Sequence, residues 1–96
     1  MTLPLPRDTA ELLAARVLGW LALDADVTGR FAAMAGADVT ELRDRVREPE
    51  FLGFVLDFLL SDEQMLLACC EALTVPPDHP MRARAALPGG DLPNWT

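Results

Sequence analysis

The chain has 96 residues, a formal net charge of −7 and two cysteines, and these values exclude several classes of protein. A chain of this length forms one hydrophobic core, which excludes a second domain. Fifteen acidic residues against eight arginines, with no lysine, argue against general binding to nucleic-acid backbones or anionic membranes. Hydrophobic residues make up 51% of the chain and charged residues 24%, which is typical of a folded globular domain.

The N-terminal residues predict an extended tail followed by a helix. Prolines keep residues 1–7 extended, and this stretch has neither the basic leader nor the long apolar run of a secretory signal. Asp8, with Glu11 three residues later, has the pattern of a capping box. We therefore expect the first helix to run from Asp8 to about Asp24.

Two short helices are predicted next. Asp26 is a candidate N-cap for a helix over 27–35, and Gly36 suits the left-handed position that ends such a helix. Asp38 begins another Asp-x-x-Glu capping box, which predicts a helix from 39 to about 47.

Three further helices are predicted in the second half of the chain. Pro49 suits the first position of a helix that ends near Leu60. Ser61 begins a Ser-x-x-Gln capping box, which predicts a helix to about Thr74. A short sixth helix is expected over about 80–87, before a Pro-Gly-Gly stop.

The fourth predicted helix, about 50–60, is the most apolar segment of the chain. The only residues on it that are not bulky and apolar form one stripe: Glu50, Gly53 and Asp57. Such a helix belongs at the centre of a bundle, and we expect the first and fifth helices to pack around it. In the second helix, Phe31 and Met34 are expected to face inward. The predicted fold is an all-α compact bundle of five to six short helices around this hydrophobic central helix. The predicted organisation is a tail (1–7), one helical domain (8–90) and a C-terminal tail (91–96).

A candidate interaction surface lies mainly on the first helix. Ala15, Gly19 and Ala22 form a stripe of small residues that allows another helix to approach closely. Leu67 lies among charged residues of the fifth helix, and Trp95 is an aromatic residue in the C-terminal tail, which either straps across the bundle, docks a partner or is disordered. Two interpretations remain open. The fourth helix packs on the stripe and Leu67 is an ordinary surface leucine, or these residues form a self-association surface, with a homodimer as its product.

No catalytic, cofactor-binding or metal-binding residue is predicted. Cys69 and Cys70 are adjacent on a helix and have a single histidine, His79, to join them, which does not make a zinc site. We expect buried thiols, no disulfide framework and a cytoplasmic location. His79 is interpreted as a cap of the sixth helix or a surface residue. Asp57 is either a solvated edge of the central helix or a carboxylate of functional interest.

Residues 27–47 have the spacing of a helix-turn-helix, with Arg43, Arg45 and Arg47 on the second helix. However, residues 38–50 contain five acids against three arginines, which is typical of a solvated face. The leading functional prediction is a non-enzymatic protein–protein interaction or self-association module, with no cofactor and no membrane partner. The alternative is a DNA-associated regulator. A third and weaker hypothesis is a carrier of a small apolar ligand, in a cavity lined by Phe54, Phe58 and Met65.

Residues 51–70, FLGFVLDFLLSDEQMLLACC, resemble the core of a small alphaproteobacterial family, domain-of-unknown-function family 3572. The flanking segments 15–22, 29–31 and 84–90 are similar as well. The resemblance implies a small all-helical cytoplasmic bacterial protein without an assigned activity, and it assigns no role to any residue. The sequence departs from the family pattern at Cys69 and in the tail 91–96.

Overall fold

The fold was taken from a computed structural model that describes residues 3–88, with the side chains of Val39 and Arg43 left aside. The chain forms helices and no strand within this range, which confirms the all-α prediction. The elements are α1 (Arg7–Leu21), α2 (Ala25–Ala35), α3 (Val39–Arg45), α4 (Pro49–Leu60), α5 (Glu63–Leu73) and α6 (His79–Ala86). Within residues 3–88, no helix has both the length and the hydropathy needed to cross a bilayer.

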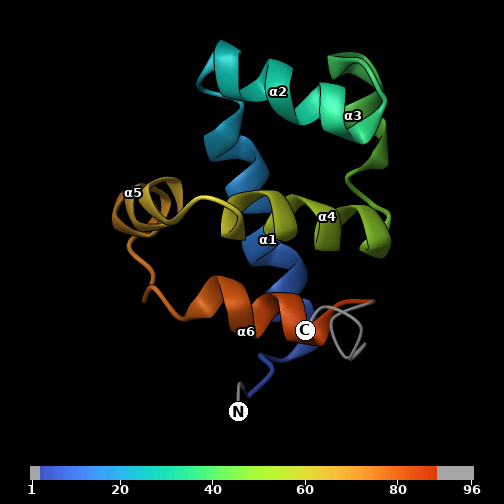
Figure 1. Cartoon of the computed structure of the whole chain (residues 1–96). Coiled ribbons are helices and arrows are strands. Elements are labelled where there is room, and N and C mark those ends of the chain that lie inside the picture. Colours follow the sequence, from blue (N-terminus) through green and yellow to red (C-terminus); the bar gives the residue numbers. More distant parts are fainter. Residues whose placement is uncertain (1–2, 89–96) are drawn as a thin grey trace.

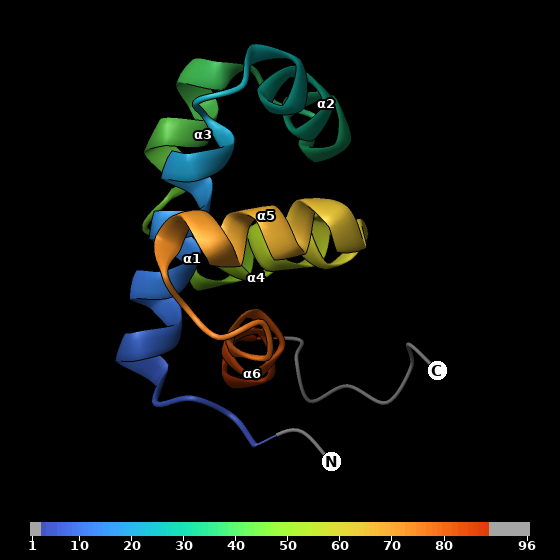
Figure 2. The ribbon, with the colours of Figure 1, turned by 90° about the vertical axis from the view of Figure 1, so that its left-hand side faces the viewer.

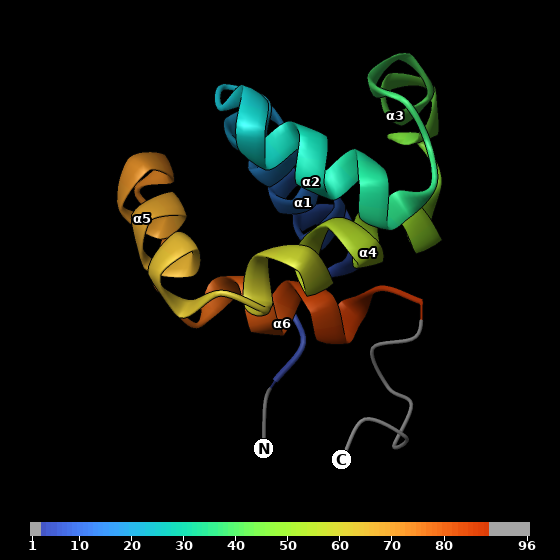
Figure 3. The ribbon, with the colours of Figure 1, turned by 45° about the horizontal axis from the view of Figure 1, so that its top comes forward.

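The helices are arranged around the crossing of α1 and α4. Figure 1 shows α4 running across α1, with α6 on one side of α4 and the α2–α3 pair on the other. Seen from the side, α5 and α6 flank α4, and α2 and α3 stay together beyond it (Figure 2). The tilted view keeps the same order, with α6 beneath α4 and α5 beyond the C-terminal end of α4 (Figure 3).

The helix α4 is the centre of the core, as predicted. Its buried residues lie around most of its circumference: Phe51, Leu52, Gly53, Val55, Leu56, Phe58 and Leu59. Their neighbours come from α1, α5 and α6, and from Phe31 of α2, whose ring packs edge-on against Phe51 and Phe58. Burial on this scale makes α4 the main source of hydrophobic stabilisation, at about 1.5–3 kcal/mol for each large side chain.

The prediction that α1 and α5 are the main partners of α4 is wrong for α5, because α6 packs more extensively than α5 on both α1 and α4. The helices α1, α4 and α6 pack most extensively on one another, and we call these three the hub. The helix α6 is polar by composition, but Pro80, Ala83 and Leu87 are buried on one face. Small side chains on that face let α6 approach α1 and α4 closely.

Two predicted helix starts in the first half are displaced. Asp8 does not cap α1, since Pro6 is already extended at the N-cap and its carbonyl accepts the Ala10 N–H at 2.9 Å. Asp24, rather than Asp26, caps α2, because α1 ends early and leaves Asp24 extended with its carboxylate facing the free N–H groups. Gly36 ends α2 with φ +69°, as predicted.

Later boundaries follow the same physical rules. The capping box that begins at Asp38 is present, and α3 ends at Arg45 because Pro49 keeps Glu48 extended. Ser61 does not cap α5. Its hydroxyl instead donates to the Phe58 carbonyl at the end of α4, and Asp62 caps α5 by accepting from the Met65 N–H.

Residues 3–6 form an extended strap along α6. The Leu5 N–H donates to the Arg82 carbonyl at 3.1 Å, and Arg82 Nε donates to the Leu3 carbonyl at 3.0 Å. The side chain of Leu5 is buried in the core. Residues 3–6 are therefore extended, as predicted, and held against α6. The C-terminal tail 91–96 lies outside the described residues.

Candidate functional site

The small-residue stripe of α1 lines a pocket of about 260 Å³ between α1, α2 and α3. We call it the α1–α3 pocket. Its floor is made of buried side chains, among them Phe31 and Leu42, while Gly19 and Ala22 are exposed at its rim. The lining residues are Ala15, Leu18, Gly19, Leu21, Ala22, Thr28, Phe31, Leu42 and Val46.

The simpler interpretation of this stripe, that the fourth helix covers it, is wrong. The helix α4 packs on α1, but none of its residues lines the α1–α3 pocket. The stripe therefore keeps an open apolar surface that the core of one molecule does not use.

The α1–α3 pocket presents no free polar group for chemistry. Its only hydroxyl, that of Thr28, lies within hydrogen-bond distance of two carbonyls, Leu21 at 3.0 Å and Asp24 at 2.8 Å. Specific small-molecule sites combine apolar walls with a few converging polar groups. This pocket suits an apolar side chain from another helix better than a reacting substrate.

Gly19 is unusual because the fold of one molecule does not require it. A Cβ built on Gly19 meets no atom within 4 Å, and the residue lies inside a regular helix. A glycine in a helix interior costs about 0.5–1 kcal/mol relative to alanine. On the same face, two turns earlier, Leu12 is 64% exposed. The sequence analysis missed Leu12, and its seven-residue spacing from Gly19 was the available signal.

The other candidate surface residues are not part of this pocket. Leu67 is exposed on α5 and does not line it. Trp95 lies outside the described residues. The structure therefore brings together Ala15, Gly19 and Ala22.

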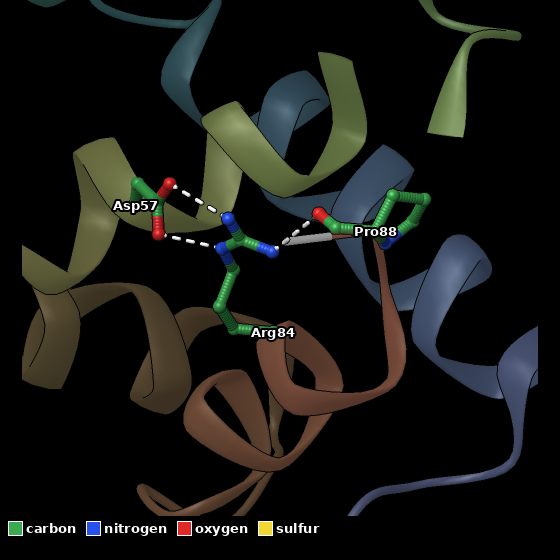
Figure 4. A network of polar contacts seen from close by, with 3 residues as sticks. All are labelled: Asp57, Arg84 and Pro88. Atoms are coloured by element: carbon green, nitrogen blue, oxygen red, sulfur yellow. Dashed lines mark hydrogen bonds and ion pairs between the residues drawn. The ribbon is translucent and has the colours of Figure 1, made fainter. Parts of the chain in front are cut away.

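A polar cluster that the sequence analysis also missed joins α4 to α6. Arg84 Nε donates to Asp57 Oδ1 at 2.6 Å, and Arg84 Nη2 donates to Asp57 Oδ2 at 3.1 Å. Arg84 Nη1 donates to the Pro88 carbonyl at 2.9 Å (Figure 4). Arg84 is only 9% exposed, whereas the Asp57 side chain is 44% exposed. Asp57 is thus the partly solvated end of a bidentate ion pair.

Gly53 makes room for this arginine. A Cβ on Gly53 would lie 3.0 Å from Arg84 Nη1 and 3.2 Å from Arg84 Cζ. Of the predicted stripe, Gly53 and Asp57 therefore contact a side chain from α6, while Glu50 is exposed. The signal for this contact in the sequence was one arginine in an otherwise small and apolar turn of α6. The arrangement fixes the chain where it leaves α6, and we assign it a structural role.

The cysteines are buried, as predicted. Burial raises the pKa of the Cys69 thiol to about 11, with Cys70 adding to the rise and Arg16 opposing it. Burial, followed by Asp78, also raises the pKa of Cys70. Both groups are free thiols, and a protonated buried thiol is a poor nucleophile. Among residues 3–88, no group of three or more His, Cys, Asp or Glu is placed to hold a metal ion.

The remaining candidates are accounted for by local contacts. His79 is the first residue of α6, so Asp78 and not His79 occupies the N-cap position. Arg45 lies 5.0 Å from the centre of the Phe51 ring and pairs with Glu48 at 3.6 Å. At the place of the third hypothesis, a ligand cavity lined by Phe54, Phe58 and Met65, the Phe31 ring packs against the first two, with ring centres 5.3 and 5.1 Å apart.

Comparison with known proteins identifies the family to which the chain belongs. No curated protein and no solved structure matches the chain. A family model that matches residues 7–90 confirms the resemblance seen in residues 51–70. The chain belongs to the family described as "Protein of unknown function (DUF3572)".

Proposed function

We propose that this protein is a non-enzymatic self-association module, and that a second copy of the chain covers the α1–α3 pocket. The observation that carries the proposal is Gly19. It is an exposed helix-interior glycine at the rim of an apolar pocket, and no atom of residues 3–88 outside its own helix backbone lies within 4 Å of a Cβ built on it. Close approach of another helix is the common structural reason for such a glycine.

The distribution of charge supports a second copy as the partner. Residues 3–47, which form α1, α2 and α3, contain seven acids and six arginines, a net charge of −1. Residues 48–88 contain seven acids and two arginines, a net charge of −5. Two copies that meet through their α1 faces therefore join their nearly neutral halves and keep the acidic halves apart, which limits repulsion.

The shape of α1 is also self-complementary. Leu12 protrudes and Gly19 leaves a hollow two turns away on the same face. A twofold axis midway between them places the Leu12 of each copy against the Gly19 of the other. Isologous pairing of this kind is the usual form of a small homodimer.

Sedimentation equilibrium of the full chain tests the proposal. We expect a monomer–dimer equilibrium in the wild type and a dissociation constant at least about tenfold higher for Gly19→Leu, a loss of about 1.4 kcal/mol or more. Leucine has a higher helix propensity than glycine, so the monomer fold is expected to persist. Leu12→Ala is expected to weaken the dimer in the same direction.

The matched control is Gly29→Leu. Gly29 lies inside α2, is exposed and likewise has no atom within 4 Å of a built Cβ, but it does not line the α1–α3 pocket. It is expected to leave the dissociation constant unchanged. A wild type that stays monomeric at millimolar concentration, or a Gly19→Leu variant that dimerises as well as the wild type, contradicts the proposal.

A DNA-associated regulator is the second candidate, favoured by one observation. The helices α2 and α3 pack on each other across a three-residue turn that contains Gly36, which is the connectivity of a helix-turn-helix. Fluorescence polarisation with duplex DNA at low salt tests it. Binding that Arg47→Ala weakens would favour this function, and absence of binding would reject it.

A further inference from the structure

The helices α2 and α3 are joined to the rest of the molecule by few buried side chains. Residues 25–45 comprise these two helices and the turn between them, and we call them the α2–α3 lid. They lie together at one end of the molecule, beyond α4 (Figures 1 and 2). Among the described side chains of the lid, three are buried: Phe31, Ala32 and Leu42. Neither α2 nor α3 packs extensively on a helix of the hub, whereas the three hub helices pack extensively on one another.

Phe31 is the largest buried side chain of the lid. It is 1% exposed, and its ring centre lies 5.8, 5.3 and 5.1 Å from those of Phe51, Phe54 and Phe58 on α4. An open pocket lies on each side of this contact. Phe31 lines the α1–α3 pocket, and Phe51 and Phe54 line a second pocket of about 260 Å³ between α2, α3 and α4. One aromatic side chain therefore makes most of the apolar contact between the lid and α4.

The last turn of α2 adds little to this contact. Met34 lies one turn after Phe31 and is 62% exposed, so the prediction that it faces inward is wrong. The physical reason is that the second pocket, and not a packed helix, lies beside Met34. Phe54, on the α4 side of the same pocket, is only half-buried.

The polar contacts between the lid and the rest of the described chain lie at the two ends of the lid. At its start, the Thr28 hydroxyl lies 3.0 Å from the Leu21 carbonyl. At its end, Arg45 pairs with Glu48 at 3.6 Å and lies 5.0 Å from the centre of the Phe51 ring. These contacts join residues close in sequence across the linkers 22–24 and 46–48, so they restrain a movement of the lid about those linkers only weakly.

Polar contacts in the rest of the molecule join residues far apart in sequence. Arg84 reaches Asp57 between α6 and α4, and Arg16 Nη2 donates to the Leu73 carbonyl at 2.8 Å between α1 and α5. Such contacts break only when whole helices separate. The hub and α5 are therefore held together in a way that the α2–α3 lid is not.

We infer that the α2–α3 lid opens as one unit about the linkers 22–24 and 46–48 while the hub stays folded, with Phe31 as its latch. Segments with few buried apolar contacts open at a lower free energy than the core of the same protein. Opening withdraws Phe31 from the rings of α4 and uncovers the faces of α1 and α4 that the lid covers.

The opening regulates the self-association surface, a step that rests on the proposed function. The α1–α3 pocket has one wall on the hub, which includes Gly19, and another on the lid, which includes Leu42. A second copy that fills the pocket contacts both walls, so it binds the closed form and keeps the lid shut. The apparent affinity between copies then falls in proportion to the fraction of chains with a closed lid.

Hydrogen exchange of the full chain, followed by mass spectrometry at low protein concentration, tests the lid. We expect peptides from α2 and α3 to share a protection factor at least about tenfold lower than that of peptides from α4. Low concentrations of urea are expected to lower the protection of α4 steeply and that of the lid weakly, since opening the lid exposes less surface than global unfolding. Equal protection and equal urea dependence in the two regions would overturn the lid.

The latch is tested by Phe31→Leu, with Met34→Leu as the matched control. Leucine is smaller than phenylalanine and loses part of the contact with the rings of α4, so the protection of the lid is expected to fall severalfold. Met34 lies on the same helix but is exposed, and its replacement is expected to leave the protection of the lid unchanged. Equal effects of the two variants would contradict the role of Phe31.

A concentration series tests the regulation. In the wild type, the protection of the lid is expected to rise with protein concentration, and in Gly19→Leu it is expected to stay constant. Protection that does not change in the wild type would overturn the locking by a second copy. Sedimentation equilibrium of the same samples then shows whether a dimer forms at all, so a failure of the proposed function is recognised separately from a failure of the lid.

Discussion

Gly53 and Gly19 both lie inside helices, but they differ in what surrounds them. Gly53 is buried in the hub, where a Cβ would lie 3.0 Å from the Arg84 guanidinium. Gly19 is at the exposed rim of the α1–α3 pocket, where a Cβ would meet nothing within 4 Å. The hub uses its glycine to complete one molecule. The α1 face carries the cost of a helical glycine that nothing in residues 3–88 packs against, and this is the basis of the proposed contact with a second copy.

The same contrast appears in the polar groups. The hub encloses an arginine that is 9% exposed and provides one hydrogen-bond acceptor for each of its three guanidinium nitrogens. The α1–α3 pocket holds a single hydroxyl, whose one proton is already directed at two carbonyls, Leu21 at the end of α1 and Asp24 at the N-cap of α2. Polar contacts within the molecule thus fix how the helices of the hub pack, whereas the α1–α3 pocket is apolar and open.

The largest expected effect is at Arg84. Arg84→Ala removes three charge-assisted hydrogen bonds and the side chain that covers Gly53, and we expect the free energy of unfolding to fall by about 3 kcal/mol. Arg84→Lys is expected to recover little, since lysine has no planar fork for the Asp57 carboxylate. Urea denaturation followed by circular dichroism measures both.

Arg82→Ala is the control for that experiment. Arg82 is on the same helix but pairs with Asp78 at 3.8 Å near the surface and donates one bond to the Leu3 carbonyl. Its loss is expected to cost about 1 kcal/mol or less. Equal losses for the two variants would contradict the special role of Arg84 in the hub.

The next effect is a loss of stability at alkaline pH. Burial raises the pKa of the Cys69 thiol in the folded protein from 9.0 to about 11, so the unfolded chain releases this proton at lower pH. The free energy of unfolding therefore falls as pH rises from 9 to 11, by about 2 kcal/mol, and then levels off.

The composition makes this measurement clean. The chain has no lysine and no tyrosine, so the main other side chain that titrates in that window is Cys70, whose pKa burial also raises. We expect Cys69→Ala to remove most of this decrease in the free energy of unfolding. Urea denaturation curves recorded over a series of pH values measure it. A wild-type stability that stays constant up to pH 11 would show that water reaches this thiol in the folded state.

Alanine at the two glycines gives effects of opposite sign. Gly19→Ala is expected to raise the free energy of unfolding of the monomer by about 0.5–1 kcal/mol, because only helix propensity changes. Gly53→Ala is expected to lower it by about 1 kcal/mol, because the Arg84 guanidinium must shift by a few tenths of an ångström while it is held by its hydrogen bonds. Thermal unfolding at low protein concentration compares them.

A double variant tests the cause. In an Arg84→Ala background, Gly53→Ala is expected to lose its penalty, since the crowded group is gone. A penalty that persists would place the cause in the Pro88 carbonyl, the third atom near that Cβ.

The smallest effect compares two aspartates with the same sequence pattern. Asp38→Ala removes a side chain that caps α3 and is expected to cost about 0.5–1 kcal/mol. Asp8→Ala is expected to cost less, since Asp8 lies inside the first turn of α1 and caps nothing. Thermal melts of the two variants separate them, and equal shifts would contradict the capping difference.

Much of the secondary structure follows from the sequence because its signals are local. Gly36, Pro49 and the Asp38 capping box act within one helical turn, and each stands where it was expected. The misplaced caps at Asp8, Asp26 and Ser61 have two causes. At Asp26 and Ser61 a second capping residue, Asp24 or Asp62, competes for the helix start, whereas at Asp8 the helix already begins after the extended Pro6 without any side-chain cap.

The sequence by itself determined an all-helical chain with α4 at its centre, because a helix that is apolar over most of its circumference is stable only when surrounded. Only the tertiary structure decided that α6 rather than α5 completes the hub, that Arg84 lies across Gly53 to reach Asp57, and that the small-residue stripe of α1 stays uncovered. These contacts join residues far apart in the chain. Their existence depends on how closely two backbones approach, which helical periodicity does not specify.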